Sequence, residues 1–338
     1  MKAEFRPPYS KNRKPLQELL PLDTPLALYI DPTNICNFSC KFCFNGDDNA
    51  VAKMNKTMMS MDSFRKIVDD LKKFPSKIKI IHLHGYGEPL LNKNLSKMIK
   101  ILKDEDVVER VAITTNGSAF TDENMESIIS AGLDQIHISI YGLSQEQYAD
   151  ITGTRCNFPK LLESIKKLYS MKGNCHIHIK IIGDYFSKEE QETFLGIFGD
   201  FCDTIFIDNA ANLWPDIDIS HTIGSDAKLK HQYSQEVEDY KICPQLFYQM
   251  LVNSDGRVSP CCVDFSQEVN IGDIKDLSLK DIWESEYLRN MRIDHLNGKA
   301  DKYEGCKNCK YPIVGSSVNI TPYQKELLTI YSNTTTNL

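Results

Sequence analysis

The chain has 338 residues, and 41% of them are hydrophobic, which is ordinary for a soluble fold and enough to bury a sizeable core. Its net charge is −7, with acidic and basic residues interspersed, so it lacks the basic stripe of a nucleic-acid-binding protein, and we expect no DNA or RNA partner. No run approaches 18 apolar residues, and no apolar segment follows the basic start, so we expect a cytoplasmic protein without a membrane span.

The first 24 residues carry four prolines among charges, which predicts a lead segment that wraps the surface. From Leu26 onward, apolar β-rich runs alternate with helical periods. Strands are expected at 26–31, 78–84, 108–115, 134–141, 175–182 and 203–208, and helices at 62–74, 92–104, 122–131, 157–171 and 187–200.

Six strand-helix units that run in one direction imply parallel strands and right-handed crossovers. The expected fold class is therefore α/β, a partial (β/α)6 TIM-like barrel, with a doubly wound sheet as the alternative. In either arrangement the chemistry gathers at the carboxyl ends of the strands.

Eleven cysteines in a chain without an export signal argue against disulfides and for metal binding or catalysis. Cys36, Cys40 and Cys43 follow the first strand at the spacing Cys-x3-Cys-x2-Cys, and three soft ligands on one tight loop suit a soft metal centre. A closed zinc site would need a fourth ligand nearby, but the next candidate, His82, is far along the chain. Three ligands for a four-iron cluster leave one iron open, while a zinc loop or plain buried thiols remain the alternatives.

The stretch Gly85-Tyr86-Gly87-Glu88-Pro89 directly follows the second strand. Its glycines would let backbone groups approach a ligand, and the Glu88 carboxylate could hold an ammonium group. Asn116 and Ser139 stand at the ends of the third and fourth strands. Ordinary turn chemistry would also explain each of these stretches.

Strand periodicity separates an outward apolar face from an inward polar face. The inward face carries five of the eight histidines in the chain and several other polar residues. These side chains are His82, His84, His137, His176, His178, Tyr141, Lys180 and Asp208. A lumen this polar is costly unless a polar ligand fills it, which favours a hydrophilic substrate cavity, although a one-residue register slip would invert the argument.

After Asp208 the pattern changes, and we expect a bridge with a helix at 226–240. Asp255-Gly256 predicts a hairpin between 250–253 and 257–259. A further helix is expected from Leu277 to Arg292, with Trp283, Tyr287 and Leu288 on one face. A second group of thiols follows the pattern Cys-x17-Cys-x44-Cys-x2-Cys and could hold zinc or a second iron-sulfur cluster. These thiols are Cys243, Cys261, Cys306 and Cys309.

In this order, residues 25–310 resemble a radical SAM barrel followed by the auxiliary-cluster domain known as SPASM/twitch, with Cys-x12-Gly-x4-Cys as the specific piece. Further cysteines are lacking after Cys309, so the resemblance implies a twitch-type protein with one auxiliary cluster. The spacing is similar to that of the radical SAM dehydrogenase that oxidises an aminocyclitol in aminoglycoside biosynthesis. We expect a lead segment at 1–24, the barrel at 25–215, a bridge at 216–242, the twitch domain at 243–315 and a tail at 316–338.

The resemblance implies two four-iron clusters, one on Cys36, Cys40 and Cys43 and one on the second group of thiols. It also implies a set of residues that contact S-adenosylmethionine. These are Phe42, Gly87, Glu88, Pro89, Asn116 and Ser139. Such an enzyme would receive an electron from a flavodoxin- or ferredoxin-like reductant and cleave S-adenosylmethionine to a 5'-deoxyadenosyl radical, which abstracts hydrogen from a substrate carbon.

An alcohol radical becomes a ketone when a base takes the hydroxyl proton and an acceptor takes an electron. Lys180, His178 or Asp208 could take that proton or orient the hydroxyl. The polar inward face favours a sugar, a cyclitol or a nucleoside-like substrate.

Three other functions remain open. Many SPASM proteins modify peptides; the 24 residues before the barrel leave no room for a leader-binding domain, although a partner protein could supply one. An epimerase would use a thiol such as Cys262 to return hydrogen, although a spare cysteine beside a ligand is more often only a buried small residue. The chain could also be a zinc protein without catalysis.

Overall fold

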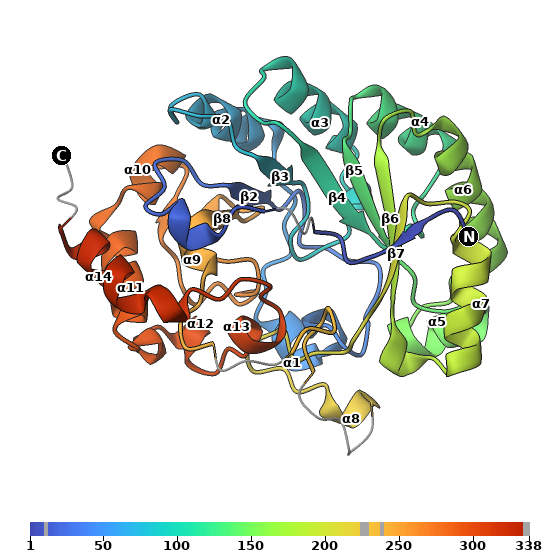
Figure 1. The fold of residues 1–338 in the computed structure, drawn as a ribbon. Coiled ribbons are helices and arrows are strands. Elements are labelled where there is room, and N and C mark those ends of the chain that lie inside the picture. The colour runs from blue at the N-terminus through green and yellow to red at the C-terminus, as the bar shows by residue number, and fades with distance from the viewer. Residues whose placement is uncertain (10–12, 224–229, 237–239, 334–338) are drawn as a thin grey trace.

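The computed structural model describes residues 1–9, 13–223, 230–236 and 240–333. They form a ten-stranded sheet in the order β1-β7-β6-β5-β4-β3-β2-β8-β9-β10 (Figure 1). The six central strands run parallel to one another. They are β2 (Ala27–Ile30), β3 (Ile80–His82), β4 (Val111–Thr115), β5 (Gln135–Ser139), β6 (His176–Ile182) and β7 (Thr204–Asp208).

Each strand and helix expected up to residue 208 is present, and the α/β fold class with its parallel sheet is confirmed. The helices lie outside the curved sheet (Figure 1). They are α2 (Met61–Leu71), α3 (Leu95–Asp104), α4 (Asp122–Ser130), α6 (Phe158–Met171) and α7 (Lys188–Phe198). Two shorter helices, α1 (Asp48–Ala52) and α5 (Gln145–Thr152), were not expected from the sequence.

The outward face of the sheet is an apolar core. Ile136, Ile138, Ile177, Ile179 and Ile181 on β5 and β6 are at most 1% exposed. The helices start where polar side chains satisfy their free N–H groups, as Thr121 and Ser187 do in the capping boxes of α4 and α7. Apolar and polar residues alternate along the strands, and this alternation matches the inward and outward faces that the sequence predicted.

The C-terminal part extends the same sheet. β8 (Gln249–Val252) pairs parallel with β2, and the expected hairpin to β9 (Arg257–Ser259) turns at Gly256, whose φ is +100°. β10 (Gly272–Asp273) pairs with β9, while β1 (Glu4–Phe5) pairs with β7 at the opposite end. The region with the second group of thiols is therefore joined to the barrel by backbone hydrogen bonds as well as by packing.

The expected helix from Leu277 to Arg292 is wrong as one element. It is divided into α10 (Leu279–Trp283) and α11 (Glu286–Leu296), because Ser285 caps α11 by accepting from the Leu288 N–H. The break turns Tyr287 outward, where it is 49% exposed, while Trp283 and Leu288 stay buried.

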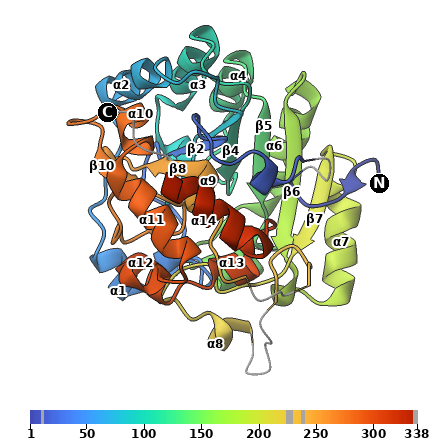
Figure 2. The same cartoon turned by 60° about the vertical axis from the view of Figure 1, so that its left-hand side comes forward.

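The other helices of this part are short, apart from the last. They are α8 (Ser220–Ile223), α9 (Gln245–Tyr248), α12 (Glu304–Lys307), α13 (Tyr311–Val314) and α14 (Gln324–Asn333). Helix α14 lies along α11 (Figures 1 and 2), with Leu327 and Tyr331 buried. Of the helix expected at 226–240, residues 230–236 are described and are not helical, and the other positions lie largely outside the described residues. Among the described helices, none is long and apolar enough to cross a membrane.

The loops after β2 and β3 touch backbone to backbone. A Cβ atom on Gly87 would lie 2.3 Å from the Thr33 carbonyl oxygen and 2.4 Å from that of Ile35. The Glu88 N–H donates to the same Ile35 oxygen at 2.9 Å. Only glycine permits this approach, so the cysteine loop and the glycine-rich loop form one unit.

We expect Gly87→Ala to lower the free energy of unfolding by about 1–3 kcal/mol, because the added methyl group forces the two loops apart. The control is Gly196→Ala in α7, where an added Cβ meets nothing within 4 Å. That change should raise stability by up to about 1 kcal/mol through helix propensity. Urea unfolding followed by circular dichroism measures both, and equal midpoints for the two variants would contradict the loop contact.

Candidate active site

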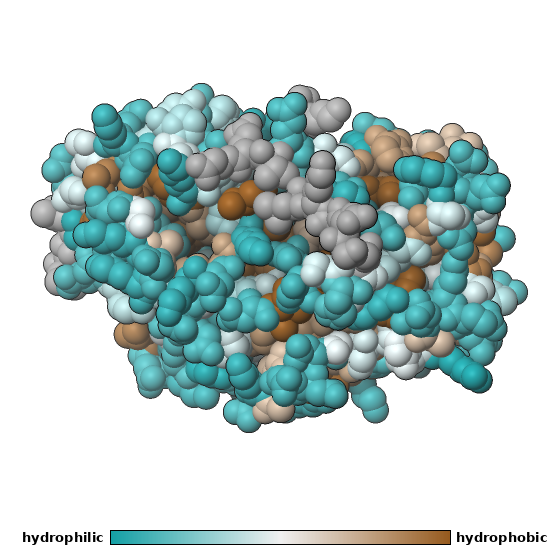
Figure 3. All heavy atoms as spheres, turned by 90° about the horizontal axis from the view of Figure 1, so that it is seen from below, coloured by the Kyte–Doolittle hydropathy of each residue, from teal (hydrophilic) through white to brown (hydrophobic). Residues whose placement is uncertain are grey.

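A cavity of about 250 Å³ lies at the carboxyl ends of the parallel strands. Its walls come from the cysteine loop, the loop after β3, the ends of β4 to β7 and the segment after β7. On the side of α1 and α8, hydrophobic side chains show between hydrophilic ones (Figure 3). The sheet topology therefore brings together the motifs that the sequence placed at strand ends.

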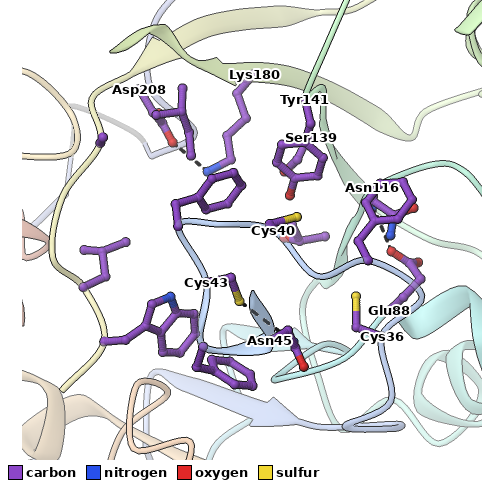
Figure 4. Close-up of a pocket in the computed structure, with 18 of the residues that line it drawn as sticks. Cys36, Cys40, Cys43, Asn45, Glu88, Asn116, Ser139, Tyr141, Lys180 and Asp208 are labelled. Atoms are coloured by element: carbon purple, nitrogen blue, oxygen red, sulfur yellow. Dashed lines mark hydrogen bonds and ion pairs between the residues drawn. The ribbon is translucent and has the colours of Figure 1, made fainter. Parts of the chain in front are cut away.

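Cys36, Cys40 and Cys43 all line this cavity, and their sulfur atoms surround a common space (Figure 4). Burial raises the pKa of the Cys36 thiol to about 11, with the Glu88 carboxylate adding to the effect. Burial also raises the pKa of the Cys43 thiol to about 12, with Cys36 adding to the effect. The Asn45 side-chain amide lies 3.9 Å from the Cys43 sulfur. Such thiols lose their protons when a cationic centre is bound between them, so the donor set suits a metal cluster.

In the part of the chain that the structure describes, no three His, Cys, Asp or Glu side chains lie close enough to hold one metal ion. A four-iron cluster is larger than an ion, and its thiolate ligands stand further apart. Three thiols on one loop would leave the fourth iron of such a cluster open for a ligand.

Glu88 is buried at the cavity wall, and three donors surround its carboxylate. Oε1 accepts from the Thr115 hydroxyl at 2.6 Å and the Leu90 N–H at 3.1 Å, and Oε2 accepts from the Asn116 N–H at 2.8 Å. Burial raises the pKa of Glu88 to about 7. A carboxylate has about four acceptor positions, so one remains for a ligand while the others tie two loops together.

The other expected cofactor contacts divide into two groups. Phe42, Gly87, Asn116 and Ser139 line the cavity, whereas Pro89 starts a 3-10 turn behind Glu88 and does not. The Asn116 amide donates to Asn37 Oδ1 at 2.9 Å and so connects the end of β4 with the cysteine loop.

The inward histidines mostly fill the barrel floor rather than the cavity. Of the five, His84 lines the cavity, where its Nδ1 accepts from the Thr114 N–H at 3.1 Å. His82 stacks on Tyr29 with 4.4 Å between ring centroids, and His137 meets His178 at 5.3 Å. Desolvation lowers the pKa of His82 to about 4 and that of His137 to about 3, so these rings are neutral core residues. The substrate cavity is therefore smaller and less polar than the alternation suggested.

His178 does not reach the cavity, in contrast to its expected catalytic role. It is fully buried, its Nδ1 lies 2.8 Å from the Thr204 hydroxyl, and burial lowers its pKa to about 2. A general base must come within hydrogen-bond reach of its substrate, so the geometry offers His178 no such role.

Lys180 and Asp208 do face the cavity, from the adjacent strands β6 and β7 (Figure 4). Lys180 Nζ lies 2.6 Å from Asp208 Oδ2, and the Asp208 side chain is 1% exposed. The Gln232 amide donates to the same oxygen at 3.0 Å and also lines the cavity. In Figure 4 this charged pair lies above the loop that carries Cys40 and Cys43.

The sequence reasoning missed the contribution of the segment after β7. Leu213, Trp214, Ile219 and Gln232 close the cavity on the side where the barrel sheet is open. The change of pattern after Asp208 marked this stretch as a bridge, but no periodicity indicated that it returns to the site.

The second group of thiols gathers beside α12. Each thiol is partly buried, and burial followed by the neighbouring thiols raises the pKa of Cys306 to about 12. Cys309, Cys306 and Cys262 raise the pKa of Cys243, and Cys262, Cys306 and Cys243 raise that of Cys261, so the four thiols and Cys262 share one neighbourhood. Four converging thiols suit a fully ligated cluster.

Two family models match the sequence: the radical SAM superfamily over residues 30–195 and SPASM, an iron-sulfur cluster-binding domain, over residues 243–310. The chain is 26% identical over 322 residues to the tungsten-containing aldehyde ferredoxin oxidoreductase cofactor-modifying protein of Pyrococcus furiosus. That match covers 83% of this chain and 86% of that protein.

Two solved structures share the fold. BtrN in complex with AdoMet and 2-DOIA matches with a TM-score of 0.55 and 18% identity, over 88% of this chain and 95% of that one. Streptococcus suis SuiB bound to precursor peptide SuiA matches with a TM-score of 0.61 and 15% identity, over 92% and 75%.

The two matched segments contain the two groups of thiols, and they lie in the order expected from the sequence. Together these domains bring S-adenosylmethionine, a SAM-binding iron-sulfur cluster and an auxiliary iron-sulfur cluster as cofactors. The chain therefore belongs to the radical SAM superfamily and carries a SPASM iron-sulfur cluster-binding domain.

Proposed function

We propose that this radical SAM enzyme oxidises an alcohol carbon of a small polar molecule, such as a sugar, a cyclitol or a nucleoside-like compound. The observation that carries the proposal is the Lys180–Asp208 pair, which lines the same cavity as the three thiols. The Asp208 carboxylate is buried, and a buried charge is costly unless a polar partner or ligand uses it. The cofactors, when bound on Cys36, Cys40, Cys43 and the loop with Glu88, supply a 5'-deoxyadenosyl radical that takes hydrogen from the substrate carbon.

In this proposal, residues of the chain itself orient the substrate hydroxyl group and accept its proton. The Lys180 ammonium donates a hydrogen bond to the substrate hydroxyl oxygen and fixes its position. The Asp208 carboxylate accepts the hydroxyl proton when the carbon radical loses its electron, and Gln232 orients that carboxylate. Phe42, Tyr141 and Trp214 form apolar walls that exclude water from the radical.

The cavity volume supports a small substrate. About 250 Å³ is near the low end for a ligand site, and the cofactor must share it. SuiB, bound to its precursor peptide, shares the fold alone, so peptide modification remains the second candidate. Cys262 does not line the cavity, which disfavours the thiol donor of an epimerase.

We further propose that Cys243, Cys261, Cys306 and Cys309 hold the auxiliary cluster, and that this cluster accepts the electron lost by the substrate. Full ligation by four thiols leaves no iron free to bind substrate, which supports an electron-transfer role. A flavodoxin- or ferredoxin-like protein would supply the electron that starts each turnover.

Cys36→Ala, Cys40→Ala and Cys43→Ala should each abolish reductive cleavage of S-adenosylmethionine, because each removes a ligand from the cluster with the open iron. Chromatography of 5'-deoxyadenosine after dithionite reduction measures cleavage. The control is Cys156→Ala, which removes a buried thiol outside the two patterns. Continued 5'-deoxyadenosine formation in any of the three variants would contradict the ligand assignment.

Asp208→Asn should leave cleavage of S-adenosylmethionine within about twofold and lower oxidised product at least about 100-fold, since it removes the proton acceptor. Candidate sugars and cyclitols deuterated at carbon identify the substrate by transfer of deuterium into 5'-deoxyadenosine.

The matched control is Asp203→Asn. Asp203 pairs with Lys172 at 3.0 Å between the amino ends of β6 and β7, away from the cavity. Equal loss of product in both carboxylate variants would show that Asp208 acts through stability alone.

Replacing Cys306 and Cys309 together by alanine should remove about four irons per chain and abolish oxidised product while cleavage of S-adenosylmethionine survives. Iron analysis and product assays measure the outcome, and Cys262→Ser should change neither. Loss of product in Cys262→Ser with continued 5'-deoxyadenosine formation would instead support an epimerase.

A further inference from the structure

Four aromatic side chains, Phe44, Tyr86, Trp214 and Phe265, form a cluster between the two groups of thiols, which we call the aromatic junction. The Phe44 ring stacks on Phe265 with 4.7 Å between centroids and an angle of 3°. It also meets Trp214 at 4.7 Å and Tyr86 at 5.8 Å. Phe44 follows Cys43 and Phe265 lies shortly after Cys261 in the chain, so the junction is joined through the backbone to both groups.

Tyr86 is the member of the junction that belongs to the glycine-rich loop. Its N–H donates to Asp31 Oδ1 at 3.3 Å, and its carbonyl oxygen accepts from the Asn45 amide at 3.0 Å. Its hydroxyl donates to the backbone oxygen of Asp264 at 2.8 Å. Tyr86 is 3% exposed and Asp264 is 2% exposed, so water does not replace this hydrogen bond easily.

Asp264 in turn organises the loop beside the second group of thiols. Its carboxylate accepts from the N–H groups of Glu268 at 3.0 Å and Val269 at 2.8 Å. It lies against Gly305, where an added Cβ would be 3.0 Å from Oδ1, and Gly305 directly precedes Cys306. The carboxylate is also among the charges that raise the pKa of Cys306. The Tyr86 hydroxyl therefore holds the segment that carries one wall of the auxiliary site.

We propose that Tyr86 is a positioning residue that couples the S-adenosylmethionine loop to the auxiliary-cluster loop 264–269. Binding of S-adenosylmethionine against Gly87 and Glu88 fixes the backbone of Tyr86. Because the Tyr86 hydroxyl donates to Asp264, the loop 264–269 then also becomes more ordered. By reciprocity, an ordered auxiliary loop favours cofactor binding. The inference rests on the cofactor assignment of these loops and not on the oxidation reaction.

Hydrogen exchange followed by mass spectrometry on the anaerobic two-cluster protein, with and without S-adenosylmethionine, tests this coupling. In the wild-type protein the cofactor should slow exchange in 83–90 and, about fivefold, in 264–269. In Tyr86→Phe, protection of 83–90 should persist while the effect on 264–269 disappears, with iron content unchanged. If Tyr86 had only a structural role, its replacement would not remove the effect of S-adenosylmethionine on 264–269 while leaving the effect on 83–90.

The matched control is Tyr248→Phe, which removes a hydroxyl that donates to Gln245 at 2.9 Å within α9 rather than to the loop 264–269. It should keep the wild-type response in both segments. Persistent protection of 264–269 in Tyr86→Phe would overturn the proposal. Absence of that protection in the wild-type protein would overturn it too, even if the variant did not fold. No substrate is needed, so neither outcome bears on the proposed oxidation.

Discussion

The pairing of β8 with β2 is the interaction on which the rest of the site depends. Four consecutive residues of each strand are in parallel register, and all four residues of β8 are buried. This pairing makes the SPASM part an extension of the barrel sheet rather than a separate body. The loop that follows β2 and the turn that follows β8 therefore leave the sheet at the same end.

Within the barrel, the charged side chains of Lys180 and Asp208 lie apart from the buried histidines. The His82 imidazole packs on Tyr29 and the His137 imidazole on His178, and burial lowers the pKa of all three histidines. The charged pair Lys180–Asp208 lies closer to the carboxyl ends of β6 and β7, where these strands end at the cavity. The charged pair thus lies at the cavity, while the histidines below it contribute packing.

The family establishes the radical chemistry, and part of the cavity wall lies outside the two matched domains. The cavity wall is completed by Trp214, Ile219 and Gln232, from the segment between the two matched domains. Variation in such a segment changes the shape and polarity of a site without altering the cluster loop. Solved structures with this fold include one in complex with 2-DOIA and one bound to a precursor peptide.

The sequence alone determined the alternation of strands and helices, the carboxyl-end location of Cys36 and Glu88, and the inward face that carries Lys180, because these follow from local periodicity and chain direction. It did not determine which inward residues reach the cavity: His178 and Lys180 share one face of β6, yet only Lys180 lies high enough on the strand. The prediction for Tyr287 was also wrong, because Ser285 caps a new helix within the segment that was expected to be one helix. The place of Tyr86 was decided by the tertiary structure, because its hydrogen bond to Asp264 joins residues 178 positions apart in the chain, and no local pattern in the sequence reports such a contact.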